Sequence, residues 1–60
     1  MDRYYFYNDK TMIVYHSDEF ISDPDLIFLG SSDNTNWAMA AQVLTKNNKI
    51  NSGYKLRRAD

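Results

Sequence analysis

The stretch RYYFYNDKTMIVYH, residues 3–16, sets the architecture of this chain because it predicts a β-hairpin. Five of its fourteen residues are aromatic, and aromatic and β-branched residues favour strands. The segment NDKT, residues 8–11, interrupts the run with Asn and Asp, which hydrogen-bond their own backbone and tolerate left-handed geometry. We therefore expect strands at 3–8 and 12–16, joined by a turn at 8–11.

Both faces of this hairpin are predicted to be apolar. If Tyr7 pairs with Met12, the two faces carry Tyr5, Tyr7, Met12 and Val14 on one side and Tyr4, Phe6, Ile13 and Tyr15 on the other. A slip of one residue divides them instead into Tyr5, Tyr7, Ile13 and Tyr15 against Tyr4, Phe6, Met12 and Val14. A sheet with one solvated face should alternate apolar with polar residues. The chain predicts a single helix, which can cover only one face. In either register, the second face is therefore expected to have no cover, and it binds a partner or stays wet through its tyrosine hydroxyls.

The remainder of the chain predicts one loop, one helix and two further strands. Pro24 and the acidic residues around it favour a loop over 17–25, pinned to the domain by Phe20 and Ile21. The other expected elements are a largely buried strand at 26–30, a helix at 31–49 with its caps, a turn at 51–53 and a half-buried strand at 54–58. The fold class is α+β: a single domain, 1–60, with a small mainly antiparallel sheet in the order ββ-β-α-β, covered on one face by a single helix.

The expected helix has an apolar face and polar ends. Trp37, Ala40, Ala41 and Leu44 recur at helical spacing and should meet the sheet, with Met39 and Val43 broadening the stripe. The N-cap candidates are Ser31, Ser32, Asp33 and Asn34, and Asn47 or Asn48 can supply a left-handed C-terminal cap. In the last strand, Tyr54 and Leu56 should point to the core while Lys55 and Arg57 point outward, because the pleat repeats every two residues.

Composition excludes several kinds of site. The chain has 60 residues, no cysteine and one histidine, His16, so disulfides, thiolate nucleophiles and His/Cys metal sites are excluded. A domain of this size buries only about 60% of the surface of its unfolded chain, so its stability is marginal. Self-association is then the remaining means of stabilisation, unless the core of the monomer is unusually well packed.

No combination of residues predicts catalysis or cofactor binding. Ser31, Ser32 and Asp33 with His16 supply the residue types of a hydrolase triad, but nothing in their spacing marks one, and serines before a helix are typical caps. The carboxylates of 18–25 lack the ligand pattern of a calcium loop, and GSSDN has too few glycines to bind phosphate. We expect no catalytic, metal or cofactor-binding residues, and a surface or half-buried His16.

The charges of the chain are sorted along its length. Residues 1–36 hold seven acidic residues and two basic ones, whereas residues 37–60 hold five basic residues and one acidic. In a compact domain this small, contacts between the two halves are expected to cancel most of the field of these charges. Where they do not cancel, the acidic loop at 17–25 would steer a basic partner. Residues 1–16 are too polar for a signal peptide, and no apolar run approaches the ~20 residues of a membrane span, so we expect a cytoplasmic protein with no membrane partner.

The favoured function is a non-enzymatic protein-interaction module. The expected binding residues are Tyr5, Tyr7 and Tyr15, with Tyr4 as the alternate, because tyrosine is enriched in interface cores. If Tyr5 and Tyr7 belong to the core, the binding set becomes Tyr4, Phe6 and Tyr15. The partner would be a foreign protein or a second copy in a symmetric homodimer. Small bacterial or phage accessory proteins and inhibitors that mask a partner have this general size and class.

The alternative function is single-stranded nucleic-acid binding. Bases would stack on the aromatic sheet face, and Lys55, Arg57 and Arg58 would contact phosphates. The net charge of −1 argues against a nucleic-acid partner, because domains that bind nucleic acid are usually basic. An enzyme is the third and least favoured class.

Overall fold

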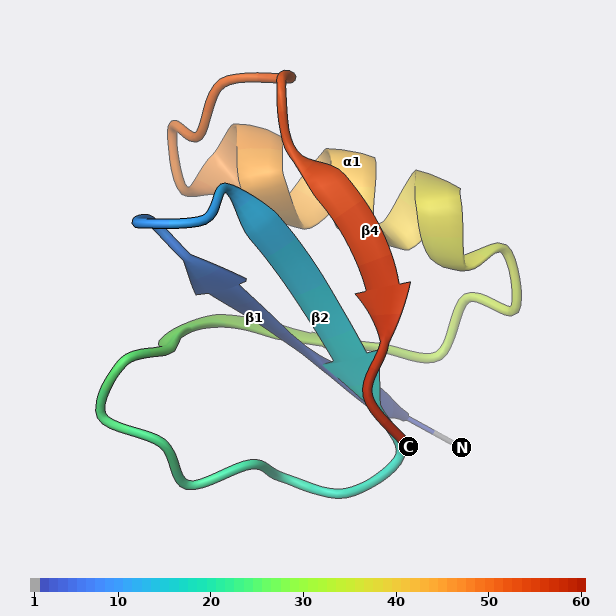
Figure 1. The fold of residues 1–60 in the computed structure, drawn as a ribbon. Helices are drawn as coiled ribbons and strands as arrows, with labels where there is room; N and C mark the ends of the chain where they lie inside the picture. The colour runs from blue at the N-terminus through green and yellow to red at the C-terminus, as the bar shows by residue number, and fades with distance from the viewer. Residues whose placement is uncertain (1) are drawn as a thin grey trace.

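The computed structural model describes residues 2–60 and has the predicted α+β architecture (Figure 1). Its elements in chain order are β1 (Arg3–Asn8), β2 (Ile13–Ser17), β3 (Ile27–Ser32), α1 (Trp37–Asn47) and β4 (Lys55–Arg58). The four strands form one mixed sheet in the order β3-β1-β2-β4. β1 pairs antiparallel with both β2 and β3, while β4 adds parallel to β2. The two edges of the sheet are therefore β3 and β4.

The hairpin forms, but its register is shifted by two residues from the predicted pairing of Tyr7 with Met12. Tyr7 pairs with Val14 rather than Met12, because Met12 belongs to the turn, with a φ of 59°. Asn8 holds this turn: its backbone oxygen accepts from the Met12 amide, and its side-chain oxygen accepts from the amides of Lys10 and Thr11. A shift of two residues keeps every paired side chain on its predicted face, so the first division of the faces is confirmed apart from Met12, and the one-residue slip is wrong.

β3 is an edge strand, and the prediction that residues 26–30 form a largely buried strand is wrong. Only Leu29 of β3 is buried, while Ile27 and Phe28 are exposed. The register with β1 shifts between Tyr5 and Phe6, so β3 carries a bulge around Leu29 and Gly30. Gly30 has a φ of 135°, a conformation that glycine alone adopts easily.

α1 begins later than its candidate caps. Ser31 and Ser32 are part of β3, and the N-cap is Asn36, whose side-chain oxygen accepts from the Met39 amide at 3.1 Å. None of the four predicted caps is used. The C-cap is Asn48, as one of the two alternatives proposed, but the left-handed residue is the following one, Lys49, with a φ of 59°.

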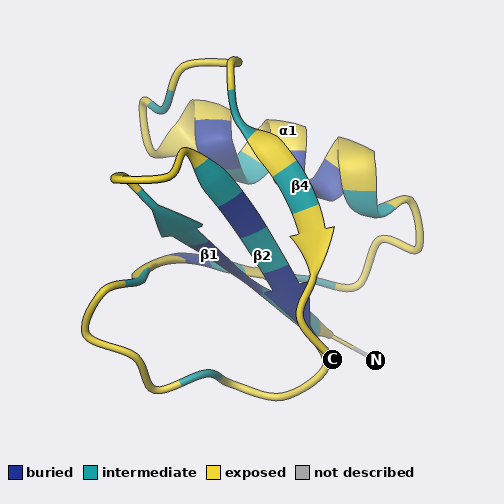
Figure 2. Cartoon of the chain, viewed as in Figure 1, coloured by how far each residue is buried: buried dark blue, intermediate teal, exposed yellow. Residues whose placement is uncertain are grey.

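The core lies between α1 and one face of the sheet (Figure 2). Its buried residues are Tyr5, Val14, Leu29, Ala40 and Ala41, and the partly buried residues packed against them are Tyr7, Leu44, Ile50, Tyr54 and Leu56. The inward position of Tyr54 and Leu56 and the exposure of Lys55 and Arg57 are confirmed. By contrast, Met39 and Val43 lie on the outer side of α1, so they do not broaden the core stripe; Thr45 is buried instead.

Candidate functional site

The sheet face opposite α1 carries Tyr4, Phe6, Tyr15 and Phe28, and it is partly covered by the loop that joins β2 to β3. The loop places Phe20 and Ile21 against this face, as predicted from their apolar character in an acidic segment. Phe6 is consequently only 1% exposed, so the expectation of an entirely uncovered second face is wrong.

The loop is attached to this face by side chains. Among the described residues, its hydrogen bonds are local or lie at its ends: the Asp18 amide donates to Asp60, the Glu19 amide to Ser17, and the Asp25 amide to Asp23. Contacts of the Phe20 ring and the Ile21 side chain thus hold the middle of the loop in place.

Four aromatic rings form a continuous cluster on this face, which we call the aromatic patch: Tyr4, Phe6, Phe20 and Phe28. Phe20 lies at the centre, with ring centroids 5.2 Å from Phe28, 5.3 Å from Phe6 and 5.8 Å from Tyr4. The contacts to Phe6 and Tyr4 are edge-to-face, a favourable geometry for aromatic pairs. Phe20 remains 58% exposed and Phe28 46% exposed, so the patch presents two large apolar side chains to solvent.

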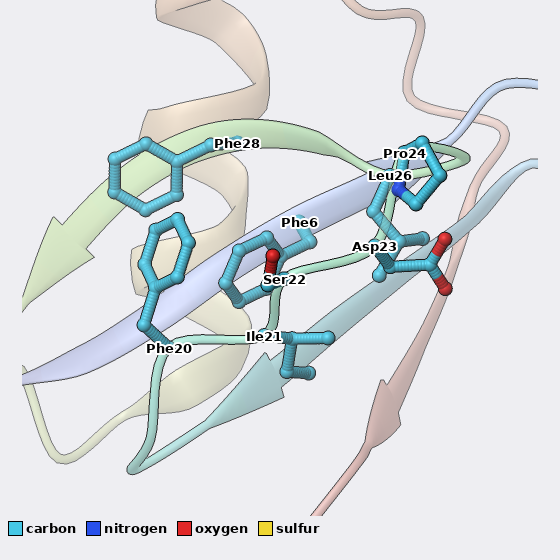
Figure 3. Close-up of a pocket in the computed structure, with 8 residues that line it drawn as sticks. All are labelled: Phe6, Phe20, Ile21, Ser22, Asp23, Pro24, Leu26 and Phe28. Atoms are coloured by element: carbon cyan, nitrogen blue, oxygen red, sulfur yellow. The ribbon is translucent and has the colours of Figure 1, made fainter.

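A shallow pocket of about 320 Å³ lies beside these rings, between the loop and the sheet (Figure 3). Phe20 and Phe28 lie side by side at one end of the pocket, and Asp23, Pro24 and Leu26 lie at the other. The Asp23 carboxylate points away from the rings. The pocket therefore offers an apolar surface with the Asp23 carboxylate at its border, which suits an apolar side chain that has a cation next to it.

The acidic groups around β3 are free to meet such a cation. Asp23 and Asp25 precede β3, Asp33 follows it, and all three are exposed. The ion pairs formed within residues 2–60 are Arg3 with Asp60 and Arg58 with Asp60, so none of these three carboxylates is neutralised internally. β3 itself, IFLGSS, carries no charge.

The predicted tyrosines do not share one surface. Tyr5 is fully buried beneath α1, so the prediction that it lies on the open face is wrong. Tyr7 packs on the same core and is half-buried. Tyr4 and Tyr15 do lie on the open face, because Tyr15 pairs with Phe6 and Tyr4 is part of the patch. Of the two predicted sets, the one with Tyr4, Phe6 and Tyr15 is the set that occupies this face.

The three predicted basic residues lie on the opposite edge of the sheet from β3. Tyr15 pairs with Arg57, and Ile13 pairs with Lys55, so these two cations share the open face with Tyr15. Arg58 projects to the other face, where its Nε lies 3.0 Å from the Asp60 carboxylate. Lys55 and Arg57 therefore remain as the free cations of β4, and both are exposed.

A second cluster of polar and aromatic groups joins the ends of the described chain. Arg3 donates from Nε to His16 Nδ1 at 3.0 Å and forms an ion pair with Asp60 at 2.7 Å, and its guanidinium lies over the Trp37 ring. Burial and the neighbouring Arg3 lower the pKa of His16, and hydrogen bonding to Arg3 holds the pKa of Asp60 far below its usual value. His16 is buried, so the expectation of a surface or half-buried histidine is wrong, and Nδ1 of its neutral ring accepts the hydrogen bond from Arg3 Nε.

This second cluster has a structural role. The His16 ring lies between Tyr5 and Trp37, with centroids 5.8 Å and 4.6 Å away. Within the described residues, no hydrogen bond joins the His16 side chain to a serine or an aspartate, as a hydrolase triad would need. The same residues contain no group of three or more His, Cys, Asp or Glu side chains placed to hold a metal ion.

Sequence reasoning did not select Phe20 and Phe28 as site residues. The sequence pattern places Phe28 in a buried strand and gives Phe20 only the role of pinning the loop. A signal for Phe20 was nevertheless present, since a phenylalanine in an acidic loop needs an apolar contact nearby. For Phe28, the sequence contains no such signal, because buried and edge strands have the same local pattern.

Comparison of the chain with protein-family models, with curated proteins and with solved structures returned no match. Nothing among residues 2–60 forms a helix with the length and hydropathy required to cross a bilayer. The geometry of the aromatic patch and of the strand beside it is therefore the basis for a functional proposal.

Proposed function

We propose that this chain is a non-enzymatic interaction module that binds a protein partner through the aromatic patch. The proposed role is that of a small accessory or inhibitor protein that masks a surface of its partner. Phe20 and Phe28 are the central contacts, and Tyr4 borders them.

One observation carries this proposal: Phe20 and Phe28 are in mutual contact and both are exposed. Single exposed apolar residues are ordinary, but a contiguous aromatic group bordered by polar residues is typical of a contact surface. Aromatic residues are enriched in interface cores because they give a large contact area and few rotamers to freeze. The pocket next to them gives a partner side chain a place to insert.

The test compares two variants that differ only in where a large exposed side chain is removed. Phe28→Ser removes a ring from the aromatic patch, whereas Met39→Ser removes a side chain of similar exposure, 52%, from the outer side of α1. We expect a tagged Met39→Ser protein to retain the partner that the unmodified protein captures from its native cells. The Phe28→Ser protein should lose that partner while keeping its circular dichroism spectrum. Capture that is equal for both variants would place the interface elsewhere.

A second candidate function, single-stranded nucleic-acid binding, is favoured by the pairing of Tyr15 with Arg57 on the open face. Lys55 lies two residues away on the same side of β4 and would extend the contact to phosphate. However, Asp23 lines a cavity together with Tyr15, and a carboxylate at this position repels phosphate. Retention on heparin at low salt, lost in Lys55→Gln with Arg57→Gln, would favour this function; elution without retention would favour the protein-binding module.

A further inference from the structure

We propose that β3 is a strand-addition site. The partner adds an extended segment to the free edge of β3, and this segment has a neutral centre and basic residues at both ends. This inference rests on the proposed protein-binding function and names the chemistry of the partner. In strand addition, main-chain hydrogen bonds supply affinity, and alternate side chains supply specificity.

The two edges of the sheet differ in how well they are protected against pairing. β4, KLRR, has three cations in its four residues, and charged side chains on an edge strand are a common protection against the addition of another strand. β3, IFLGSS, has none, and its Ile27 and Phe28 side chains are exposed. β3 pairs with β1 alone, so it keeps outward-facing backbone groups. The open edge is therefore β3.

The rest of the domain leaves this edge accessible. Among the described residues, one hydrogen bond reaches the β3 backbone from outside the sheet, from Asn48 Nδ2 to the Leu29 oxygen at 3.1 Å. Leu29 lies at the bulge and its side chain is in the core, so this bond ties the bulge to the end of α1. The backbone on either side of the bulge has no partner of this kind.

The aromatic patch lies next to the same edge. A residue directly opposite Phe28 on an added strand would share the open face with it, since paired residues in a sheet project to the same side. Its side chain would lie against the Phe20–Phe28 pair, whose centroids are 5.2 Å apart. Strand addition at β3 thus uses both the free backbone and the exposed rings, and it predicts a large apolar residue at the centre of the partner segment.

The charges at the ends of β3 select a basic segment. Asp25 lies two residues before β3 and Asp33 lies directly after it, and neither has an internal ion pair within residues 2–60. A lysine or arginine at each end of a segment aligned with β3 would meet one of these carboxylates in either strand direction. Opposite charges across strands stabilise pairing, and like charges oppose it.

The same charges oppose pairing of β3 with β3 of a second copy. An antiparallel pair aligned over Ile27–Ser32 brings the Asp25 end of one strand to the Asp33 end of the other, at both ends of the interface. This arrangement places carboxylates near carboxylates without a compensating cation from either strand. A foreign basic segment therefore fits this edge better than a symmetric homodimer does.

The test is a selection of random decapeptides, displayed on phage, against the full chain, followed by binding measurements on one selected peptide. We expect enrichment of peptides with β-branched or aromatic residues at the centre, no central proline, and Lys or Arg at both ends. The Met39→Ser protein should bind the synthetic peptide as the unmodified protein does. Phe28→Ser should weaken binding by about tenfold or more, and N-methylation of the peptide amides that face β3 should do the same, because each change removes a contact or hydrogen bond of the added strand.

Several results would overturn strand addition. An acidic or proline-rich consensus, the absence of any enriched peptide, or equal tolerance to N-methylation at every position would each exclude it. A concentration-dependent dimer whose β3 amides become protected from hydrogen exchange would assign the edge to a second copy instead. If a cellular partner is captured in a Phe28-dependent way but the selected peptides fail these tests, the proposed protein-binding function stands and the strand-addition mechanism is rejected.

Discussion

The ring of Phe20, from the loop between β2 and β3, lies against the ring of Phe28 on the edge strand, with a centroid distance of 5.2 Å. Phe20 also contacts Phe6 and Tyr4, so this side chain, together with Ile21, attaches the loop to the open face. The contact therefore serves two purposes: it covers Phe6, and it assembles an exposed pair of rings beside an open sheet edge.

Replacement of Phe20 by Ala should release the loop while the domain remains folded. The ring is 58% exposed, so its removal should cost only about 1 kcal/mol of the free energy of unfolding, less than the loss of a buried phenylalanine. Cleavage by a protease between residues 18 and 26 should become faster, because the contacts of the Phe20 ring with three other rings are lost. Limited proteolysis followed by mass spectrometry measures this change. Unchanged cleavage in the loop would show that Phe20 does not hold it.

Tyr5→Phe should leave the domain as stable as before, or more stable. The Tyr5 hydroxyl is buried and has no hydrogen-bond partner within the described residues, and an unsatisfied buried hydroxyl is costly. The ring remains in place in the variant, so packing against Ala40 and Ala41 is preserved. Urea denaturation measures the difference, with Tyr7→Phe as the control at a half-buried tyrosine. A loss of more than about 1 kcal/mol in Tyr5→Phe would mean that this hydroxyl makes a favourable hydrogen bond.

Gly30→Ala should destabilise the fold for two separate reasons. A φ of 135° is unfavourable for any residue with a side chain, and an added Cβ would lie 2.9 Å from Cδ2 of Leu44. The expected loss in the free energy of unfolding is about 1–3 kcal/mol.

Leu44→Ala should itself cost about 2–5 kcal/mol, because Leu44 packs against the core cluster. Combined with Leu44→Ala, Gly30→Ala should cost less than it does alone, since the steric part disappears and the backbone part remains. Strict additivity of the two losses would contradict this explanation.

The stability of the domain should fall as the pH drops below the ordinary pKa of histidine. Burial and the proximity of Arg3 lower the pKa of His16 from 6.5, so below that pH the unfolded chain binds a proton that the folded chain does not. This contribution is complete above pH 6.5 and is lost as the pH falls toward the folded-state pKa, with a slope of at most about 1.4 kcal/mol per pH unit. Denaturation between pH 7.5 and 5.5 measures the slope, and His16→Gln should flatten it. A proton NMR titration of His16 with a midpoint at or above 6.5 would contradict the assignment.

The parts of the fold that could be predicted are those set by local pattern. The faces of the hairpin follow from alternation, which survives a register shift of two residues, so Tyr5 and Phe6 were separated correctly even though the paired residues were not. Tyr54 and Leu56 were placed correctly for the same reason. Likewise, Ala40 and Ala41 lie on the face of the helix that its spacing predicts to be apolar, and both are buried.

The missed features depend on contacts between distant segments. Residues 26–30 are apolar, but their burial depends on whether another strand or the helix covers them, and in this fold β3 is left at the edge. Tyr5 is buried and Phe28 is exposed because α1 covers the face that carries Tyr5. The sequence does not indicate which face is covered, since both faces carry apolar residues. The N-cap was missed because β3 continues through Ser32, which delays the helix to Trp37.

The most direct test of the binding surface is photocrosslinking in native cells, with p-benzoylphenylalanine placed at position 28 and, as the matched control, at position 39. Both positions are exposed to a similar degree, 46% and 52%, but only Phe28 belongs to the aromatic patch. We expect ultraviolet light to produce a discrete adduct with another protein from position 28 and none from position 39. An adduct from position 39 alone, or an adduct only between two copies of this chain, would contradict a foreign protein partner at the aromatic patch.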